Sequence, residues 1–154
     1  MVNIRPKTTI TMKVNGLGDS HSRSQISVRD VTSVIDEPIE RHGTNEGPSP
    51  TETLMASLIG CTNVISKKIA TKMGFELGDM DIKLSAKFDR RGVLLQDEVD
   101  TPFTDIVLDI TVKTDGTAEQ MTAMQVDLAK FCPIAKVIRG SGVTIAENWT
   151  TQPL

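Results

Sequence analysis

Hydrophobic and polar residues alternate along the first third of the chain, which is typical of half-buried β-strands. Apolar residues occupy every second position over residues 10–14, and Asn15-Gly16 follows as a turn signal. Residues 26–28 alternate again, and residues 31–35 give another short apolar segment. The sequence therefore predicts three short strands before a loop that is rich in turn residues.

A long helix is the clearest element that the sequence predicts. Ser49 at the N-cap, Pro50 at the first helical position and Glu52 at the third form a capping box. The helix is expected to run to Met73, where Gly74 supplies a left-handed cap.

Most faces of this helix are apolar in its first half. One stripe, with spacings of four, three, four and four residues, consists of Leu54, Leu58, Cys61, Ile65 and Ile69. Lysine at positions 67, 68 and 72 marks a solvated face in the second half. A helix that is apolar on most sides needs cover on most sides. We therefore expect it to lie centrally, with a second copy of the chain completing the cover.

The second half of the chain predicts an α+β arrangement. Alternation indicates strands over residues 79–88 and 106–112, and a second capping box begins a helix that ends at Phe131, itself expected in the core. Cys132-Pro133 interrupts this helix and starts a short one, since proline is accepted as the first residue of a helix. A final strand passes through residues 143–145. The whole chain, residues 1–154, is expected to be one domain.

Composition excludes several classes of protein. The 154 residues carry 17 basic and 20 acidic side chains, a net charge of −3, so no basic field favours nucleic acid. Four phenylalanines, one tryptophan and no tyrosine are too few aromatic residues for a base-stacking platform. No apolar run can span a bilayer, and the N-terminus lacks a secretory signal. The sequence therefore favours a cytoplasmic protein without a membrane or nucleic-acid partner.

The chain has two cysteines, Cys61 and Cys132, and two histidines, His21 and His42. Their spacing matches no zinc finger or ribbon, so no metal is expected. Cys132 precedes a helix, and the partial positive charge of a helix N-terminus lowers a thiol pKa. The pair could be two small core residues or a redox couple. Spacing alone leaves both interpretations open, because 71 residues separate the cysteines.

Two motifs resemble the OsmC/Ohr family of thiol-dependent hydroperoxide reductases. The first is the segment 43–54, Gly-Thr-Asn-Glu-Gly-Pro-Ser-Pro-Thr-Glu-Thr-Leu, followed by Leu-Ile-Gly-Cys-Thr at 58–62. The second is the Cys-Pro at 132–133 that begins a short helix near the C-terminus. The order of elements agrees with the family from about residue 8 to residue 149.

The resemblance implies an OsmC-like fold, with antiparallel sheets packed on the long central helix, and an intertwined homodimer. It implies that Cys61 is the peroxidatic thiolate and Cys132 the resolving thiol. The substrate would be an alkyl or fatty-acid hydroperoxide, and a dithiol, for which a lipoyl-type group is one candidate, would be the reductant. No bound cofactor is implied, and the cellular role would be defence against oxidative stress.

Two positions depart from the family pattern. Well-characterised members have a carboxylate where this chain has Thr51, and the nearest one here is Glu52, which also fits a purely capping role. The activating arginine of the family comes from the N-terminal strands, where Arg23, Arg29 and Arg41 are candidates. We expect Arg29, which follows an alternating segment, to hold the thiolate together with Glu52.

Three functions remain open from the sequence. The first is a peroxidase that uses Cys61 and Cys132. The second is an OsmC-like protein that binds a small apolar ligand, with the cysteines only lining the pocket. The third is a redox sensor or disulfide-exchange protein. The distance between the two sulfur atoms, and whether an arginine reaches them, would best distinguish these three functions.

Overall fold

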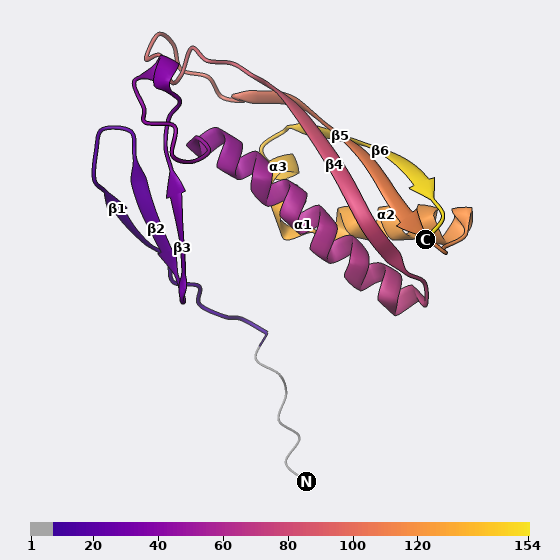
Figure 1. Cartoon of the computed structure of the whole chain (residues 1–154). Coiled ribbons are helices and arrows are strands. Elements are labelled where there is room, and N and C mark those ends of the chain that lie inside the picture. Colours follow the sequence, from indigo (N-terminus) through magenta and orange to yellow (C-terminus); the bar gives the residue numbers. More distant parts are fainter. Residues whose placement is uncertain (1–7) are drawn as a thin grey trace. The chain divides into compact units, whose positions relative to one another are not determined.

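The computed structural model describes residues 8–154, which divide into two compact units. The first unit ends at Leu54 and contains a small sheet, a loop and the first turn of a long helix. The second begins at Met55 and contains the rest of that helix, a larger sheet and two further helices. Figure 1 shows the elements in chain order.

The sheet of the first unit is antiparallel throughout. Its strands β1 (Asn15–Gly18), β2 (Ser24–Val28) and β3 (Val31–Ile35) follow each other in the order β1-β2-β3. The last two agree with the sequence-based prediction, and a single turn of 3-10 helix, η1 (Ile39–Arg41), follows them.

The first predicted strand is wrong in position. Residues 10–14 have no regular structure, and Asn15-Gly16, expected as a turn, lies inside β1. Ile10 and Met12 are 73% and 83% exposed, because no neighbouring strand among residues 8–154 pairs with this segment. Alternation alone therefore did not produce a strand, since a strand forms only where its backbone groups find partners.

A buried carboxylate organises the loop that follows β3. Asp36 accepts hydrogen bonds from the backbone N–H of Glu37 (2.8 Å) and Thr44 (3.0 Å), from the Thr44 hydroxyl (2.6 Å) and from the Glu46 N–H (3.2 Å). These donors, led by the Thr44 hydroxyl and joined by Ser22, outweigh burial and hold the pKa of Asp36 well below its usual range. The loop is thus fixed from within before the long helix begins.

Helix α1 spans Pro50–Met73, as the capping pattern predicted. The Ser49 N–H donates to Glu52 Oε2 at 2.7 Å, and the Glu52 N–H donates to Ser49 Oγ at 3.4 Å, which completes the capping box. At the other end Gly74 has a φ of +82°, the left-handed conformation that favours glycine.

The sheet of the second unit is mixed. Its strands are β4 (Leu77–Phe88), β5 (Phe103–Thr114) and β6 (Thr144–Gln152). β5 pairs antiparallel with β4 but parallel with β6. The sequence-based prediction of antiparallel sheets is therefore wrong for β6. Helices α2 and α3 connect β5 to β6 and return the chain to the end of the sheet at which β5 begins, so β6 runs in the same direction as β5.

Helices α2 (Ala118–Phe131) and α3 (Pro133–Gly140) lie with α1 on one face of this sheet (Figure 1). The Thr117–Gln120 capping box that begins α2 is formed as predicted. β5 is buried at every second residue beneath the helices, and the core also takes apolar residues from α1, α2 and α3. Its almost inaccessible side chains include Leu58, Ile106, Leu108, Ile110, Met124 and Leu128. The α+β class expected from the sequence is confirmed.

The buried side of α1 differs from the predicted stripe. It consists of Met55, Leu58, Thr62, Ser66, Ile69 and Ala70, whereas Leu54 is 40% exposed. Short polar residues can face the sheet because their hydroxyls are satisfied locally, as when Ser66 donates to the Asn63 carbonyl at 3.2 Å. Phe131, expected in the core, is 58% exposed at the end of α2. Among residues 8–154, no helix is long and apolar enough to cross a membrane.

Candidate functional site

The two cysteines meet inside the second unit. The Cys132 thiol donates to Cys61 Sγ, and the two sulfur atoms lie 2.8 Å apart. Both cysteines are free thiols in this structure. The distance exceeds the about 2.05 Å of a disulfide bond, yet it is short enough that a small movement would bring the sulfurs to bonding distance. Folding thus places side by side two thiols that are 71 residues apart.

Cys132 is positioned by the junction of two helices. Its backbone N–H donates to the Leu128 carbonyl at 2.9 Å and so ends α2. Its sulfur accepts the Ala135 N–H at 3.4 Å and so caps α3, in which Pro133 is the first residue. The Cys-Pro pair therefore fixes the thiol by its backbone on both sides, which orients it toward α1.

Burial sets the acidity of Cys132. The side chain is 0% exposed. Loss of hydration, helped by the hydrogen bond with Cys61, raises the pKa of Cys132 from 9.0 to about 11. The N–H groups of Ile134 and Ala135 lower it, but by less. The expectation of a lowered pKa from the helix N-terminus is therefore wrong, because desolvation outweighs the helix dipole.

Cys61 lies in the middle of α1 and is partly exposed, whereas Cys132 is buried. Cys61 also packs against the core of the second unit. This difference gives the pair an accessible sulfur and a protected one. A reagent from solvent would therefore meet Cys61 first.

Glu52 lies nine residues before Cys61 in the same helix and serves as the capping carboxylate. Donation from the Ser49 N–H, then from its hydroxyl, holds the pKa of Glu52 below its usual value, and the charge of Arg41 contributes a little. The Thr51 hydroxyl lies 3.2 Å from the Ser49 hydroxyl. Thr51 and Glu52 are thus both part of the start of α1, and the capping box gives Glu52 a structural role there.

The three candidate arginines differ in their partners. Arg23 forms ion pairs with Asp19 (3.2 Å) and Glu46 (2.8 Å). Arg41 pairs with Glu37 at 2.8 Å. Arg29 is exposed in the turn between β2 and β3 with a φ of +55°, and among residues 8–154 it forms no ion pair. Of the three candidates, Arg29 is therefore the one that forms no ion pair with another residue of the described chain.

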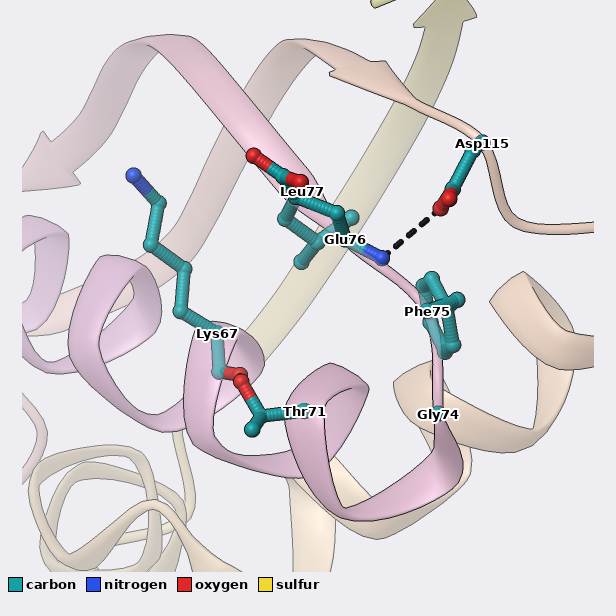
Figure 2. A pocket seen from close by; sticks show the side chains of 7 residues that line it. All are labelled: Lys67, Thr71, Gly74, Phe75, Glu76, Leu77 and Asp115. Carbon is teal, nitrogen blue, oxygen red and sulfur yellow. Dashed lines mark hydrogen bonds between the residues drawn. The ribbon is translucent and has the colours of Figure 1, made fainter.

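Two pockets flank α1 in the second unit. The larger, about 530 Å³, surrounds the end of the helix, and Figure 2 shows the side chains that line it. Its polar groups are engaged internally: the Thr71 hydroxyl donates to the Lys67 carbonyl at 2.9 Å, and the Glu76 N–H donates to Asp115 at 2.7 Å (Figure 2). Neither cysteine lines this pocket. These internal contacts indicate that the pocket is part of the turn that connects α1 to β4.

The smaller pocket is a groove between α1 and α2 of about 340 Å³. Helix α2 contributes Asp127 and Phe131 to its lining. Helix α1 contributes the apolar residues Ile65, Ile69 and Met73 together with Lys68 and Lys72. Ile65 follows Cys61 by one helical turn, and Phe131 directly precedes Cys132. The sequence interpretation missed this groove, because it assigned the lysines simply to a wet face and Phe131 to the core.

A family model described as OsmC-like protein matches residues 43–148, more than half of the chain. The chain therefore belongs to the OsmC-like protein family, as its two cysteine motifs predicted. A comparison with curated proteins gives no match.

Solved structures share the fold over nearly the whole chain. An OsmC-like protein from Mycoplasma pneumoniae superposes with a TM-score of 0.77 at 14% identity, covering 92% of this chain and 97% of its own. An organic hydroperoxide resistance protein, OsmC, from Legionella pneumophila gives 0.64 at 15% identity, covering 95% and 99%. The organic hydroperoxide resistance protein OhrB of Bacillus subtilis gives 0.57 at 20% identity, covering 93% and 98%. At these identities the likeness establishes the fold.

Proposed function

We propose that the protein is a thiol-dependent peroxidase that reduces organic hydroperoxides, with Cys61 as the nucleophile and Cys132 as the resolving thiol. The 2.8 Å between the two sulfur atoms is the observation that carries this proposal. Two core cysteines need not touch, whereas a peroxidatic and a resolving cysteine must reach each other. The names of the relatives from Legionella pneumophila and Bacillus subtilis, both organic hydroperoxide resistance proteins, support the same chemistry.

The assignment of roles follows from exposure and acidity. Cys61 is partly exposed, while Cys132 is buried with a pKa raised to about 11 and stays a thiol at neutral pH. The thiolate is the reactive form of cysteine, so a buried, protonated Cys132 is a poor first nucleophile. Its S–H donates to Cys61 Sγ, so Cys132 already faces the sulfur that it would resolve.

The reaction would proceed in two thiol steps. The Cys61 thiolate attacks the terminal oxygen of the hydroperoxide, the O–O bond breaks, and the alkoxide leaves as an alcohol after taking up a proton. Cys61 is then a sulfenic acid. The sulfur of Cys132, losing its proton, attacks the Cys61 sulfur; the S–O bond breaks, water leaves and a disulfide forms. A dithiol, of which a lipoyl-type dithiol is one candidate, would return both cysteines to thiols by disulfide exchange.

A reducing cytosol would suit this cycle, since structural disulfides rarely persist there and a catalytic one can be recycled. We propose that compartment, and an alkyl or fatty-acid hydroperoxide as substrate, because the partly exposed Cys61 packs against the apolar core of the second unit.

A second function remains on the same scaffold: a protein that binds an apolar ligand or senses redox state without significant peroxidase activity. The start of α1 supports this second function. Thr51 stands where the family pattern has a carboxylate, and the Glu52 carboxylate accepts a hydrogen bond in the capping box. A carboxylate committed to capping is less available to organise an arginine beside the thiolate.

Hydroperoxide consumption and intact mass separate the two functions. We expect the parent protein to consume cumene hydroperoxide with a dithiol reductant, and to lose two hydrogen atoms in mass when oxidised without it. Cys61→Ser should abolish both effects. Cys132→Ser should retain one rapid turnover and accumulate a sulfenic or sulfinic acid at Cys61. Two unmodified thiols in the parent protein after hydroperoxide treatment would contradict the peroxidase and leave the second function.

A further inference from the structure

An ion pair joins the short helix α3 to the last strand of the second unit. Arg139 Nη2, in the last turn of α3, donates to Glu147 Oε1 on β6 at 3.1 Å. The other carboxylate oxygen of Glu147 accepts the indole N–H of Trp149 at 3.3 Å. Both oxygens of this carboxylate are therefore engaged. Among residues 8–154 this is the one ion pair that connects α3 to another element.

The pair is largely shielded from water. The side chain of Glu147 is 15% exposed and that of Arg139 is 32% exposed. Arg139 Nη1 is buried and forms no hydrogen bond within residues 8–154, so Glu147 is the group that compensates the guanidinium. Glu147 also lies opposite the inaccessible Leu108 of β5, which anchors it to the core of the sheet. Removing one partner of such a pair leaves a poorly hydrated charge and is costly.

Helix α3 depends on contacts of this kind. Its eight residues, Pro133–Gly140, form about two turns, and an isolated helix of that length is unstable in water. Within the second unit α3 is held by the burial of Ala135 and Ile138 and by the contact of Arg139 with β6. In its first turn the Ala135 N–H donates to the sulfur of Cys132 at 3.4 Å. The orientation of that sulfur therefore depends on α3 staying in place.

We infer that Arg139 and Glu147 are positioning residues for Cys132: their ion pair keeps α3 on β6 and thereby keeps the Cys132 thiol buried against Cys61. The role of Cys132 as a resolving thiol rests on the proposed function, whereas its access and orientation can be measured without any hydroperoxide. Arg139 and Glu147 act through α3 and not on the reacting atoms. Without the pair, α3 detaches more often, the bond from the Ala135 N–H is lost, and Cys132 meets solvent.

Thiol labelling measures how often α3 detaches. Every protein in this comparison carries Cys61→Ser, so that Cys132 is the one thiol. Arg139→Met keeps the apolar stem and removes the charge, and it should raise the rate at which iodoacetamide labels folded Cys132 at least tenfold. Arg139→Lys, whose ammonium can make the same single contact, should stay within about threefold of the parent. The faster labelling should be unchanged by urea below the unfolding transition, because a local opening exposes little surface.

Lys130→Met is the matched control. Lys130 forms an ion pair of 3.0 Å two residues before Cys132, but its partner Asp127 lies in the same helix, α2. Its loss should change the labelling of Cys132 by less than about twofold. Parent-like labelling of Arg139→Met would overturn the inference, as would labelling that rises steeply with urea, since that indicates global unfolding. If Arg139→Met does not fold, Glu147→Gln, which keeps an acceptor for the indole N–H, takes its place with the same expectations.

A glutathione equilibrium measures the positioning when both cysteines are present. Two protein thiols become a disulfide while one glutathione disulfide becomes two glutathione thiols, so the equilibrium constant gives the effective concentration of the pair. Arg139→Met should lower this effective concentration at least threefold, because Cys132 faces Cys61 in fewer molecules, and Arg139→Lys should restore it. A loss of global stability alone leaves the folded pair unchanged. An unchanged effective concentration in Arg139→Met would overturn the inference.

A hydroperoxide assay separates this inference from the proposed function. Arg139→Met should react at Cys61 at the parent rate but leave at least threefold more protein as sulfinic acid, since slower disulfide formation exposes the sulfenic acid to a second hydroperoxide. Exposure of Cys132 in Arg139→Met without reduction of any hydroperoxide by the parent would reject the peroxidase alone. Normal reduction by the parent, with parent-like labelling and disulfide formation in Arg139→Met, would reject the positioning role alone.

Discussion

At the scale of single residues, Cys132 shows how position and environment act in opposite directions. Its place at the start of α3 supplies two N–H groups that favour the thiolate, and its burial favours the thiol. Burial dominates because removing a charge from water costs more than two partly aligned N–H groups return. The same residue is therefore both a helix cap and a protonated partner for Cys61.

The two thiols should differ sharply in reactivity. In the folded protein at about pH 8, we expect iodoacetamide to label Cys61 at least tenfold faster than Cys132, since only the thiolate reacts. Because the pKa of Cys132 is raised to about 11, its labelling should rise only as the pH approaches that value. Peptide mass spectrometry measures both sites. Labelling in denaturant, where burial is lost, should make the two rates similar; equal rates in the folded protein would contradict the assignment of roles.

The arginines are the second prediction at this scale. A guanidinium beside Cys61 would stabilise its thiolate, and Arg29 is the candidate without an ion pair in residues 8–154. We expect Arg29→Ala to lower the rate of reaction with hydroperoxide at least tenfold, about 1.4 kcal/mol in the barrier.

Arg23→Ala and Arg41→Ala are the controls, measured by the same stopped-flow assay. They should mainly affect stability, because their partners are Asp19, Glu46 and Glu37. Parent-like rates for Arg29→Ala with a slow Arg41→Ala would move the role to Arg41, whose charge already acts on Glu52.

At the scale of elements, the start of α1 decides whether Glu52 is structural or chemical. The capping box joins its carboxylate to the Ser49 N–H at 2.7 Å. Glutamine keeps a carbonyl oxygen that can accept this bond, whereas alanine removes it.

We expect Ser49→Ala and Glu52→Ala each to lower the free energy of unfolding by about 1 kcal/mol. Glu52→Gln should cost less than half of that. Chemical denaturation measures the stabilities, and hydroperoxide turnover is measured on the same samples. A Glu52→Gln variant with native stability but strongly reduced turnover would show that the negative charge serves the reaction; unchanged turnover would leave capping as its role.

At the scale of the whole molecule, exposed apolar surface remains on described elements. Val64 on α1 is 47% exposed, and Ile10, Met12 and Val14 are 73%, 83% and 60% exposed. Such surface favours association, and the family resemblance predicts an intertwined homodimer.

We therefore expect light scattering at micromolar concentration to give about twice the chain mass of 16.8 kDa. Val64→Glu, which places a charge on the outer side of α1, should shift the mass toward one chain. Val137→Glu is the control, because Val137 is 73% exposed on the short helix α3 and lies apart from α1 in sequence. A mass of one chain for the parent protein would contradict the dimer.

What the sequence determined by itself is local. The bounds of α1, its capping box and the left-handed Gly74 follow from residues within a few positions of each other. The Cys-Pro junction and the alternation of β4 and β5 are equally local, and all of them were predictable. Two motifs in the correct order also sufficed to indicate the OsmC-like family.

What only the tertiary structure decided depends on contacts between distant segments. The parallel pairing of β6, the irregular backbone at residues 10–14 and the burial of Thr62 in place of Leu54 depend on which partners are available in space. The approach of Cys61 and Cys132 to 2.8 Å, and the burial that raises the pKa of Cys132, also arise only when α1 packs against the α2–α3 junction. Periodicity fixes which side of an element is apolar, but desolvation and pairing depend on what folding brings against that side.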